Sequence, residues 1–157
     1  MTVAVCYFYK NTPHSQVKEL IISTLVNSLS TLIALPNTIE ICIYDFPNTV
    51  YGGMDKHVHN RIGINATLAL TDIPKILVHE LIHVHQCHTK TLEIKNNGIY
   101  YWHGIPYDNV MPEAMSYQDY KSCPWEIDVE MKIDNLLTQA LEIAKKQHLA
   151  KLDNKSP

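Results

Sequence analysis

The sequence predicts an α+β fold in which a small mixed β-sheet of about three to five strands packs against three main helices. Two observations lead to this class. Short segments of β-type composition in the first half are separated by a long amphipathic stretch, which is the order of a β-α-β unit. Two further stretches of helical periodicity lie at residues 72–88 and 125–150. The chain has 157 residues and no internal repeat, so we expect a single domain over residues 1–157.

The first three elements alternate between strand and helix. Residues 2–9 are rich in valine and aromatic residues and predict a buried strand. A helix is expected over residues 15–35, stopping before a proline. Residues 20–39 carry no charge, but polar side chains fall between apolar ones at helical spacing, so we interpret this stretch as an amphipathic core helix and not as a membrane span. Residues 38–44 alternate and predict a second strand, parallel to the first.

The middle of the chain predicts a turn, a strand and a helix. Residues 51–55 contain two adjacent glycines and are interpreted as a turn. Residues 61–70 begin with alternating apolar positions and predict a third strand. The polar pair at 71–72 can cap the next helix, and Pro74 then falls in its first turn, where a missing N–H is tolerated. This helix is expected to end near His88.

The second half predicts a hairpin followed by helices. Residues 98–107 are rich in aromatic side chains and form a candidate β-hairpin. A short helical piece is expected over residues 112–120. Pro124 opens the last helix, which should run over residues 125–150. The polar end of the chain, residues 148–157, is expected to fray.

Composition excludes several classes of partner. The net charge is −3 with histidines neutral, and no third of the chain is strongly basic, so we expect no nucleic-acid partner. The N-terminus has neither the basic nor the small-residue features of a secretory signal, and we expect a cytoplasmic protein. The sequence carries no signal for an oligomeric state. The cysteines form no close pair and are interpreted as reduced packing residues: Cys6, Cys42, Cys87 and Cys123.

The motif that carries chemistry lies in the helix expected over residues 72–88. It contains His79 and His83, with Glu80 directly after the first histidine. Residues four apart share a helix face, so both imidazoles can bind one metal ion. In zinc hydrolases this His-Glu-x-x-His pattern holds zinc, leaves a coordination position for water and supplies a base for that water's proton. We therefore expect zinc as the cofactor and Glu80 as the catalytic base.

The other clustered histidines are interpreted as background. His85 is two residues from His83, about 200° round the helix, so it should not share the ion. His88 lies more than a turn away. Both are expected at the surface or behind the ligands, and His57 and His59 are expected in an exposed loop.

A zinc site of this kind needs a third protein ligand. A third histidine further along the same stretch is excluded, because Thr89 occupies its place. The best candidate is Glu126 at the start of the last helix, with Glu130 one turn later on the same face. The alternatives are Glu113, which could begin a short helix, and three others: Glu93, His103 and Asp128.

The segment Pro124, Trp125 and Glu126 after a His-Glu-x-x-His helix resembles the gluzincins, the thermolysin-like zinc peptidases. Their third ligand is a glutamate on a following helix, and an acid four residues later orients a ligating histidine. The resemblance implies a zincin-like fold, with Glu126 as the ligand and Glu130 as the acid behind it. The family usually has aspartate at this last position.

The chain is more closely similar to short, often phage-encoded proteins of the minigluzincin type. These pair a histidine helix with a tryptophan-glycine-tyrosine segment and a later Pro-Trp-Glu motif, which correspond here to residues 79–86, 102–107 and 124–126. The likeness extends over residues 60–135. It implies a metallopeptidase that acts on a peptide or protein substrate.

The expected reaction is hydrolysis of a peptide bond by a zinc-bound water that Glu80 activates. The strand at 61–70 would hold the substrate backbone if it is the exposed edge. Latency could come from a side chain at the open zinc position, such as Cys87, Cys123 or the C-terminal tail. Four side chains are candidates to stabilise the developing oxyanion: Tyr107, Tyr117, Tyr120 and His103.

A second hypothesis is a zinc-stabilised structural or interaction protein without turnover, for example a minor phage or host-binding component. The presence of Glu80 favours catalysis, because a purely structural zinc site needs no base.

Overall fold

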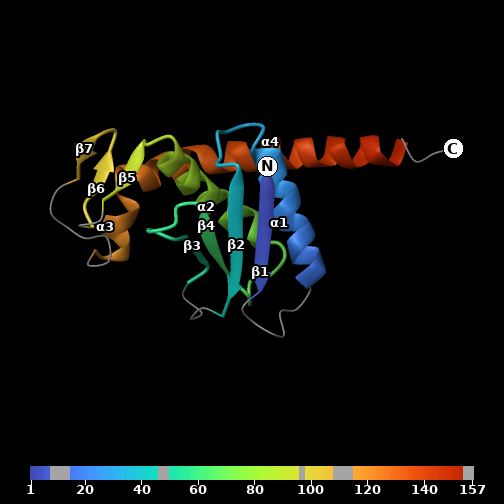
Figure 1. Cartoon of the computed structure of the whole chain (residues 1–157), viewed down its shortest axis with the longest axis horizontal. Helices are drawn as coiled ribbons and strands as arrows, with labels where there is room; N and C mark the ends of the chain where they lie inside the picture. Colours follow the sequence, from blue (N-terminus) through green and yellow to red (C-terminus); the bar gives the residue numbers. More distant parts are fainter. Residues whose placement is uncertain (8–14, 46–49, 96–97, 108–114, 154–157) are drawn as a thin grey trace.

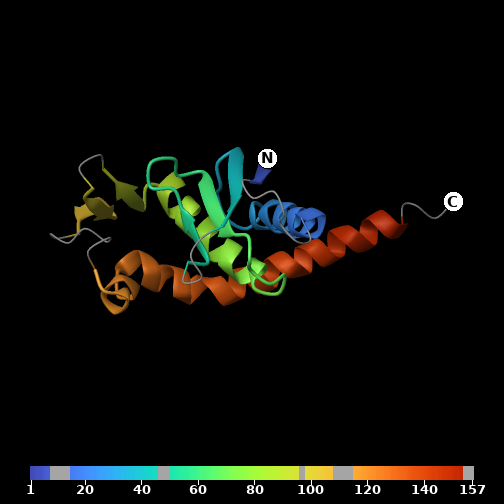
Figure 2. The same ribbon diagram turned by 90° about the horizontal axis from the view of Figure 1, so that it is seen from below.

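The structure is a computed structural model, which describes residues 1–7, 15–45, 50–95, 98–107 and 115–153. Within these ranges, four helices and two small sheets form a mixed α/β fold. The larger sheet, the pair α1 and α2, and the long α4 form three successive layers (Figure 1, Figure 2). In chain order the elements are β1 (Thr2–Tyr7), α1 (Ser15–Leu29), β2 (Thr38–Tyr44), β3 (Gly52–Met54), β4 (Arg61–Asn65), α2 (Ile73–His88), β5 (Leu92–Ile94), β6 (Tyr100–Trp102), β7 (Ile105–Pro106), α3 (Tyr117–Lys121) and α4 (Pro124–Asp153).

The larger sheet has the order β1-β2-β4-β3, with β1, β2 and β4 parallel. This confirms the predicted parallel pairing of the first two strands. The inward-facing residues of β2 and β4 are isoleucines with no exposed surface, and they pack in one core with side chains of α1 and α2: Ile39, Ile41, Ile43, Ile62 and Ile64. Burial of this β-branched face holds the sheet against the two helices.

The sequence-based placement of the sheet edge is wrong. The segment expected as a turn, residues 51–55, contains the antiparallel strand β3, which pairs with β4. β4 is therefore an interior strand with partners on both sides, and it stops at Asn65 and not at residue 70. Of the two glycines that suggested a turn, Gly52 serves close packing instead, because a Cβ there would lie 2.9 Å from Cγ2 of Ile76 on α2.

α1 ends earlier than the proline downstream predicts. After Leu29 the hydrogen bonds tighten, and the backbone N–H of Thr31 donates to the carbonyl of Ser28. The hydroxyl of Thr31 also donates to this carbonyl, at 2.8 Å. Hydroxyl side chains that bond to the local backbone compete with helical pairing, which explains the early end.

α2 confirms the predicted central helix. It begins at Ile73 with Pro74 in its first turn and runs to His88. Asp72 lies at the N-cap position, but its side chain makes no capping hydrogen bond. One side of α2 packs on the sheet and the other packs on α4, so residues of α2 that face α4 can meet residues of that helix.

The smaller sheet lies at one end of the molecule, beside α3 and the start of α4 (Figure 1). It contains the predicted hairpin, β6 and β7, and adds β5 as a third strand. His103 and Gly104 turn the hairpin with positive φ angles of 51° and 77°. The helical piece expected from residue 112 is α3, which begins at Tyr117; residues 108–114 lie outside the described ranges.

The last helix is longer than expected. α4 runs from Pro124 to Asp153, so the part of residues 148–157 that the structure describes is helical. Its C-terminal part extends beyond the rest of the molecule (Figure 2). In the described part of the chain, no helix is long and apolar enough to cross a membrane.

Candidate metal centre

Two histidines of α2 point at each other across one helical turn. Their ring centroids lie 4.9 Å apart and the rings are nearly perpendicular. Nε2 of His79 lies 3.3 Å from Nε2 of His83. This is the geometry predicted from the spacing of four, with both ring nitrogens directed to the same point.

The third candidate ligand is a carboxylate in the first turn of α4. Trp125 is 1% exposed, and its ring stacks on Tyr100 and meets the edge of Tyr107. This packing holds the start of α4, and the next residue, Glu126, then faces α2. Its carboxylate oxygens lie 3.0 Å from Nε2 of His83 and 3.5 Å from Nε2 of His79.

The three side chains predicted as metal ligands therefore meet in one place. One atom from each of His79, His83 and Glu126 lies within 4.8 Å of the other two, and together they could hold a metal ion. Oε1 of Glu126 is buried and accepts no hydrogen bond of good geometry from the described residues, although it lies close to His83. Buried polar atoms normally have a partner, so a cation between these lone pairs is a natural complement.

Glu80 lies beside this group, on the same helix. Its side chain is buried, and burial raises the pKa of this carboxyl to about 7. The charge of His83 and a backbone hydrogen bond from Met54 of β3 act in the opposite direction, while the charge of Glu126 adds to the rise. Glu80 is thus placed between the edge strand and the candidate ligands.

The group opens into a cavity of about 470 Å³. One wall is β3 with its flanking residues, and the floor is α2. The opposite walls come from β5 and β6 and from α3 with the first turns of α4. The lining includes the candidate ligands and Glu80, and apolar residues make up much of the remainder: Met54, Ile76, Leu92, Ile94, Tyr100, Trp125 and Ile133.

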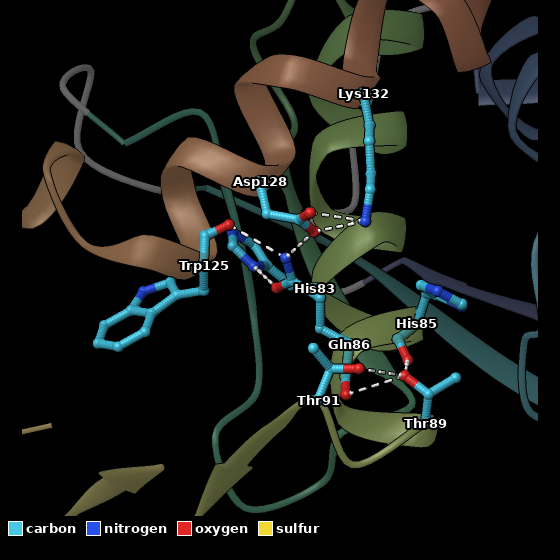
Figure 3. Close-up of polar contacts among 8 residues, drawn as sticks. All are labelled: His83, His85, Gln86, Thr89, Thr91, Trp125, Asp128 and Lys132. Atoms are coloured by element: carbon cyan, nitrogen blue, oxygen red, sulfur yellow. Dashed lines mark hydrogen bonds and ion pairs between the residues drawn. The ribbon is translucent and has the colours of Figure 1, made fainter. Parts of the chain in front are cut away.

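Behind the candidate ligands lies a polar network that the sequence did not predict (Figure 3). Nδ1 of His83 lies 2.9 Å from Oε1 of Gln86, one turn further along α2. Nε2 of Gln86 donates to the carbonyl of Trp125 at 3.0 Å and to Oδ2 of Asp128 at 2.9 Å. Lys132 in turn donates to Asp128 at 2.7 Å. The spacing of three between His83 and Gln86 was the available sequence signal.

The acid expected behind the ligands, Glu130, is exposed and lines the same cavity. Its charge acts to raise the pKa of His79, but burial and the charge of His83 lower that pKa overall. The described contacts include no hydrogen bond between Glu130 and either histidine. Its role as an orienting acid stays a prediction.

The alternative third ligands lie elsewhere or have other partners. Asp128 binds Gln86 and Lys132. Glu93 pairs with Lys95. His103 forms the hairpin turn against Trp102, and Glu113 lies outside the described residues.

The outer histidines take the places expected for them. Nδ1 of His85 lies 2.8 Å from the carbonyl oxygen of Ala34, and His88 is exposed. His57 is exposed and His59 half-buried, both in the loop between β3 and β4.

Among the candidate oxyanion donors, Tyr120 is the one with a described contact to a candidate metal ligand. It lines the cavity and hydrogen-bonds to Glu126; burial, with the charge of this carboxylate, raises the pKa of the phenol. Tyr117 is exposed at the rim beside Lys121. Tyr107 packs against Trp125 and is outside the lining.

The two cysteines considered for latency do not reach the site. Cys87 and Cys123 are buried in a second small core with Leu92 and Trp125, and neither lines the cavity. Burial raises the pKa of the Cys87 thiol to about 12. A thiol in such surroundings is a packing residue, because the thiolate is the form that binds metals.

Comparisons of the chain with protein-family models, with curated proteins and with solved structures found no match.

Proposed function

We propose that the protein is a zinc-dependent metallopeptidase with a zincin-like fold. The observation that carries the proposal is the convergence of His79, His83 and Glu126 beside Glu80 in an open cavity. Two histidines and a carboxylate are a common ligand set of catalytic zinc. An accessible cavity on one side of such a group leaves room for water and substrate.

Zinc bound here would supply Lewis acidity, which polarises a peptide carbonyl and makes water a better nucleophile at neutral pH. Glu80 is the proposed base: it takes the proton of the attacking water and delivers it to the leaving amine. The backbone N–H of Met54 donates to this carboxylate, and Glu80 lines the cavity. Tyr120 is the best placed of the four candidate donors to the developing oxyanion.

The edge strand β3 is the proposed binding surface for the substrate backbone, and it replaces the strand expected from the sequence. The N–H of Asn65 donates to Tyr51 and the N–H of Asp55 donates to Arg61, so the peptide groups of alternate residues point at β4. Those of Gly52 and Met54 point the other way, and the N–H of Met54 donates to Glu80. An extended peptide can pair with the peptide groups of Gly52 and with the carbonyl of Met54 on this side of β3 by strand addition.

The alternative is a zinc-stabilised interaction protein without turnover. A structural zinc site is closed by four protein ligands, whereas the group here has three members among the described residues and borders a cavity. Glu80 also has no part in a structural site. Both features favour catalysis.

The deciding experiment compares the wild type with Glu80→Gln. Zinc content is measured by elemental analysis, and cleavage is measured on a broad peptide library with zinc supplied. We expect one zinc per chain in both proteins and cleavage by the wild type alone. Equal zinc binding with no cleavage by either protein would exclude the peptidase in favour of the alternative.

A further inference from the structure

Every polar group of the Gln86 side-chain amide has a hydrogen-bond partner. It is 1% exposed and lies between α2 and α4 (Figure 3). Its oxygen faces Nδ1 of His83, and its nitrogen faces two oxygen atoms, the carbonyl of Trp125 and Oδ2 of Asp128. An amide has two N–H donors and one carbonyl acceptor, so all its groups have partners here.

These partners determine the tautomer of His83. Both oxygens on the far side are acceptors only, so the NH₂ of Gln86 must face them. The amide oxygen must then face the imidazole, and Nδ1 of His83 has to carry the hydrogen. In the neutral ring Nε2 then has the lone pair, and it is the atom that lies 3.0 Å from Glu126 and 3.3 Å from His79. A flipped amide would place its oxygen against a carbonyl and a carboxylate.

The same amide joins the two helices that carry the candidate ligands. On α2 it contacts His83, and on α4 it contacts the peptide carbonyl immediately before Glu126. Asp128 is also held by Lys132, which balances its charge. A rotation of α4 that moved Glu126 away from the histidines would have to break the bond to the Trp125 carbonyl.

We propose that Gln86 is a positioning residue of the metal site, which keeps Nε2 of His83 free for the metal and ties the position of Glu126 to that of His83. This deepens the function proposed above and rests on its metal site. When a hydrogen-bond partner of a metal ligand is removed, metal affinity typically falls by about 10–100-fold, and we expect a loss of this size for Gln86.

The test is Gln86→Leu, which replaces the amide side chain by an apolar one of similar size and removes all three hydrogen bonds. Gln139→Leu is the matched control, because Gln139 lies on α4 and bonds only to Asn135 among the described side chains. Zinc affinity is measured by competition with a chromophoric chelator. We expect a loss of about 10–100-fold for Gln86→Leu and no change for the control.

A second readout does not involve zinc. Long-range proton–nitrogen spectra of the metal-free protein report which ring nitrogen of His83 carries hydrogen, with the signal assigned from its absence in His83→Asn. We expect a single tautomer with Nδ1 protonated in the wild type and a mixture in Gln86→Leu. The spectra are recorded at a pH at which the ring of His83 is neutral. If the neutral ring of the wild type carries its hydrogen on Nε2 and not on Nδ1, the proposal is overturned even if zinc binds.

A third variant separates positioning from simple packing and keeps the test decisive if Gln86→Leu does not fold. Gln86→Glu accepts from His83 but sets two carboxylates against each other. With Asp128→Asn added, the new amide at position 128 donates to the new carboxylate at position 86, so the donor and the acceptor of this hydrogen bond are exchanged. The double variant should therefore recover much of the zinc affinity lost in Gln86→Glu. No recovery, or zinc affinity within about twofold of wild type in Gln86→Leu, overturns the proposal. A wild type that binds no zinc refutes the proposed function, and the tautomer readout still decides the role of Gln86.

Discussion

Gly52 is the position where one methyl group should disturb the edge of the cavity. A Cβ there would lie 2.9 Å from Cγ2 of Ile76 and 3.1 Å from the carbonyl oxygen of Gly63. At the neighbouring Gly53 a Cβ would meet no atom of the described residues within 4 Å. Neither glycine has a positive φ, so alanine suits the backbone at both positions and the pair differs only in the space available.

The magnitude follows from this overlap. Carbon atoms in contact prefer about 3.5–4.0 Å, so the new methyl must move Ile76 or the strand by more than half an ångström. Ile76 is β-branched and stiff in a helix, and the carbonyl of Gly63 is held in the sheet. Overpacking of this kind costs about 1–3 kcal/mol. Replacing glycine by alanine also stabilises by about 0.4–1 kcal/mol through the unfolded chain, equally at both positions.

We therefore expect Gly52→Ala to be less stable than Gly53→Ala by about 1–3 kcal/mol, with Gly53→Ala at or slightly above wild type. The free energy of unfolding is measured by urea denaturation. Combining Gly52→Ala with Ile76→Leu moves the branch point away, so the double-mutant cycle should show a favourable coupling of about 0.5 kcal/mol or more. Equal stabilities of the two alanine variants would refute the packing of β3 against α2.

Two further predictions concern the metal and a buried lysine. Glu126→Ala should lower zinc affinity by more than the ~100-fold that loss of an outer partner costs, measured by chelator competition; Glu142→Ala, an exposed position on the same helix, is the control. A chelator should also lower the melting temperature of zinc-loaded wild type but not of Glu126→Ala. If Glu113→Ala removes zinc instead, the third ligand is misassigned. Lys18 is 3% exposed and donates to the carbonyl of Ala66, and burial lowers its pKa below the ordinary 10.5. Between the lowered pKa and 10.5 the unfolded chain binds more protons, so the stability of the wild type should rise with pH in that window. Lys18→Met lacks this rise, and its stability relative to wild type should fall as the pH approaches 10.5; parallel pH profiles in urea denaturation would contradict this.

The features predicted best from the sequence are those set within one helix. The period of α2 and the spacing of His79 and His83 are local, so the pairing of the rings follows from helix geometry alone. Glu126 was chosen from its place after Pro124 and Trp125. Its meeting with the histidines requires α4 to cross α2, which the structure shows and helical periodicity cannot specify.

The sheet edge was missed because its signal is not local. Two adjacent glycines resemble a turn, and alternation in residues 61–70 is the same for an edge strand and an interior one. What makes Gly52 necessary is a side chain on α2, and pairing with β4 decides which strand is the edge. Neither relation has a counterpart in the neighbouring sequence.

Asp128 shows a second limit of reasoning from spacing. The spacing of four pointed from Glu126 to Glu130 as the residue behind the ligands, yet the network passes through Asp128, which stands three residues after Trp125. Residues three apart also share a helix face, so the carbonyl of Trp125 and the carboxylate of Asp128 face Gln86 together. To choose between these faces, one must know the orientation of α4 about its own axis, which the spacing of residues does not give.

The position of the site between two cores gives that orientation its importance. α2 is anchored in the main core by residues such as Leu81 and Ile82, whereas Trp125 belongs to the second core with Leu92 and Cys123. α4 joins the main core from Val129 onward, so Glu126 lies between Trp125 in the second core and the part of α4 that packs in the main core. A metal ion bound by all three candidate ligands would link the start of α4 to α2, and Gln86 makes the same connection without the metal. The geometry of the site therefore depends on how α4 packs against both cores. The tautomer of His83 and the zinc affinity of the site are the two quantities that report this packing.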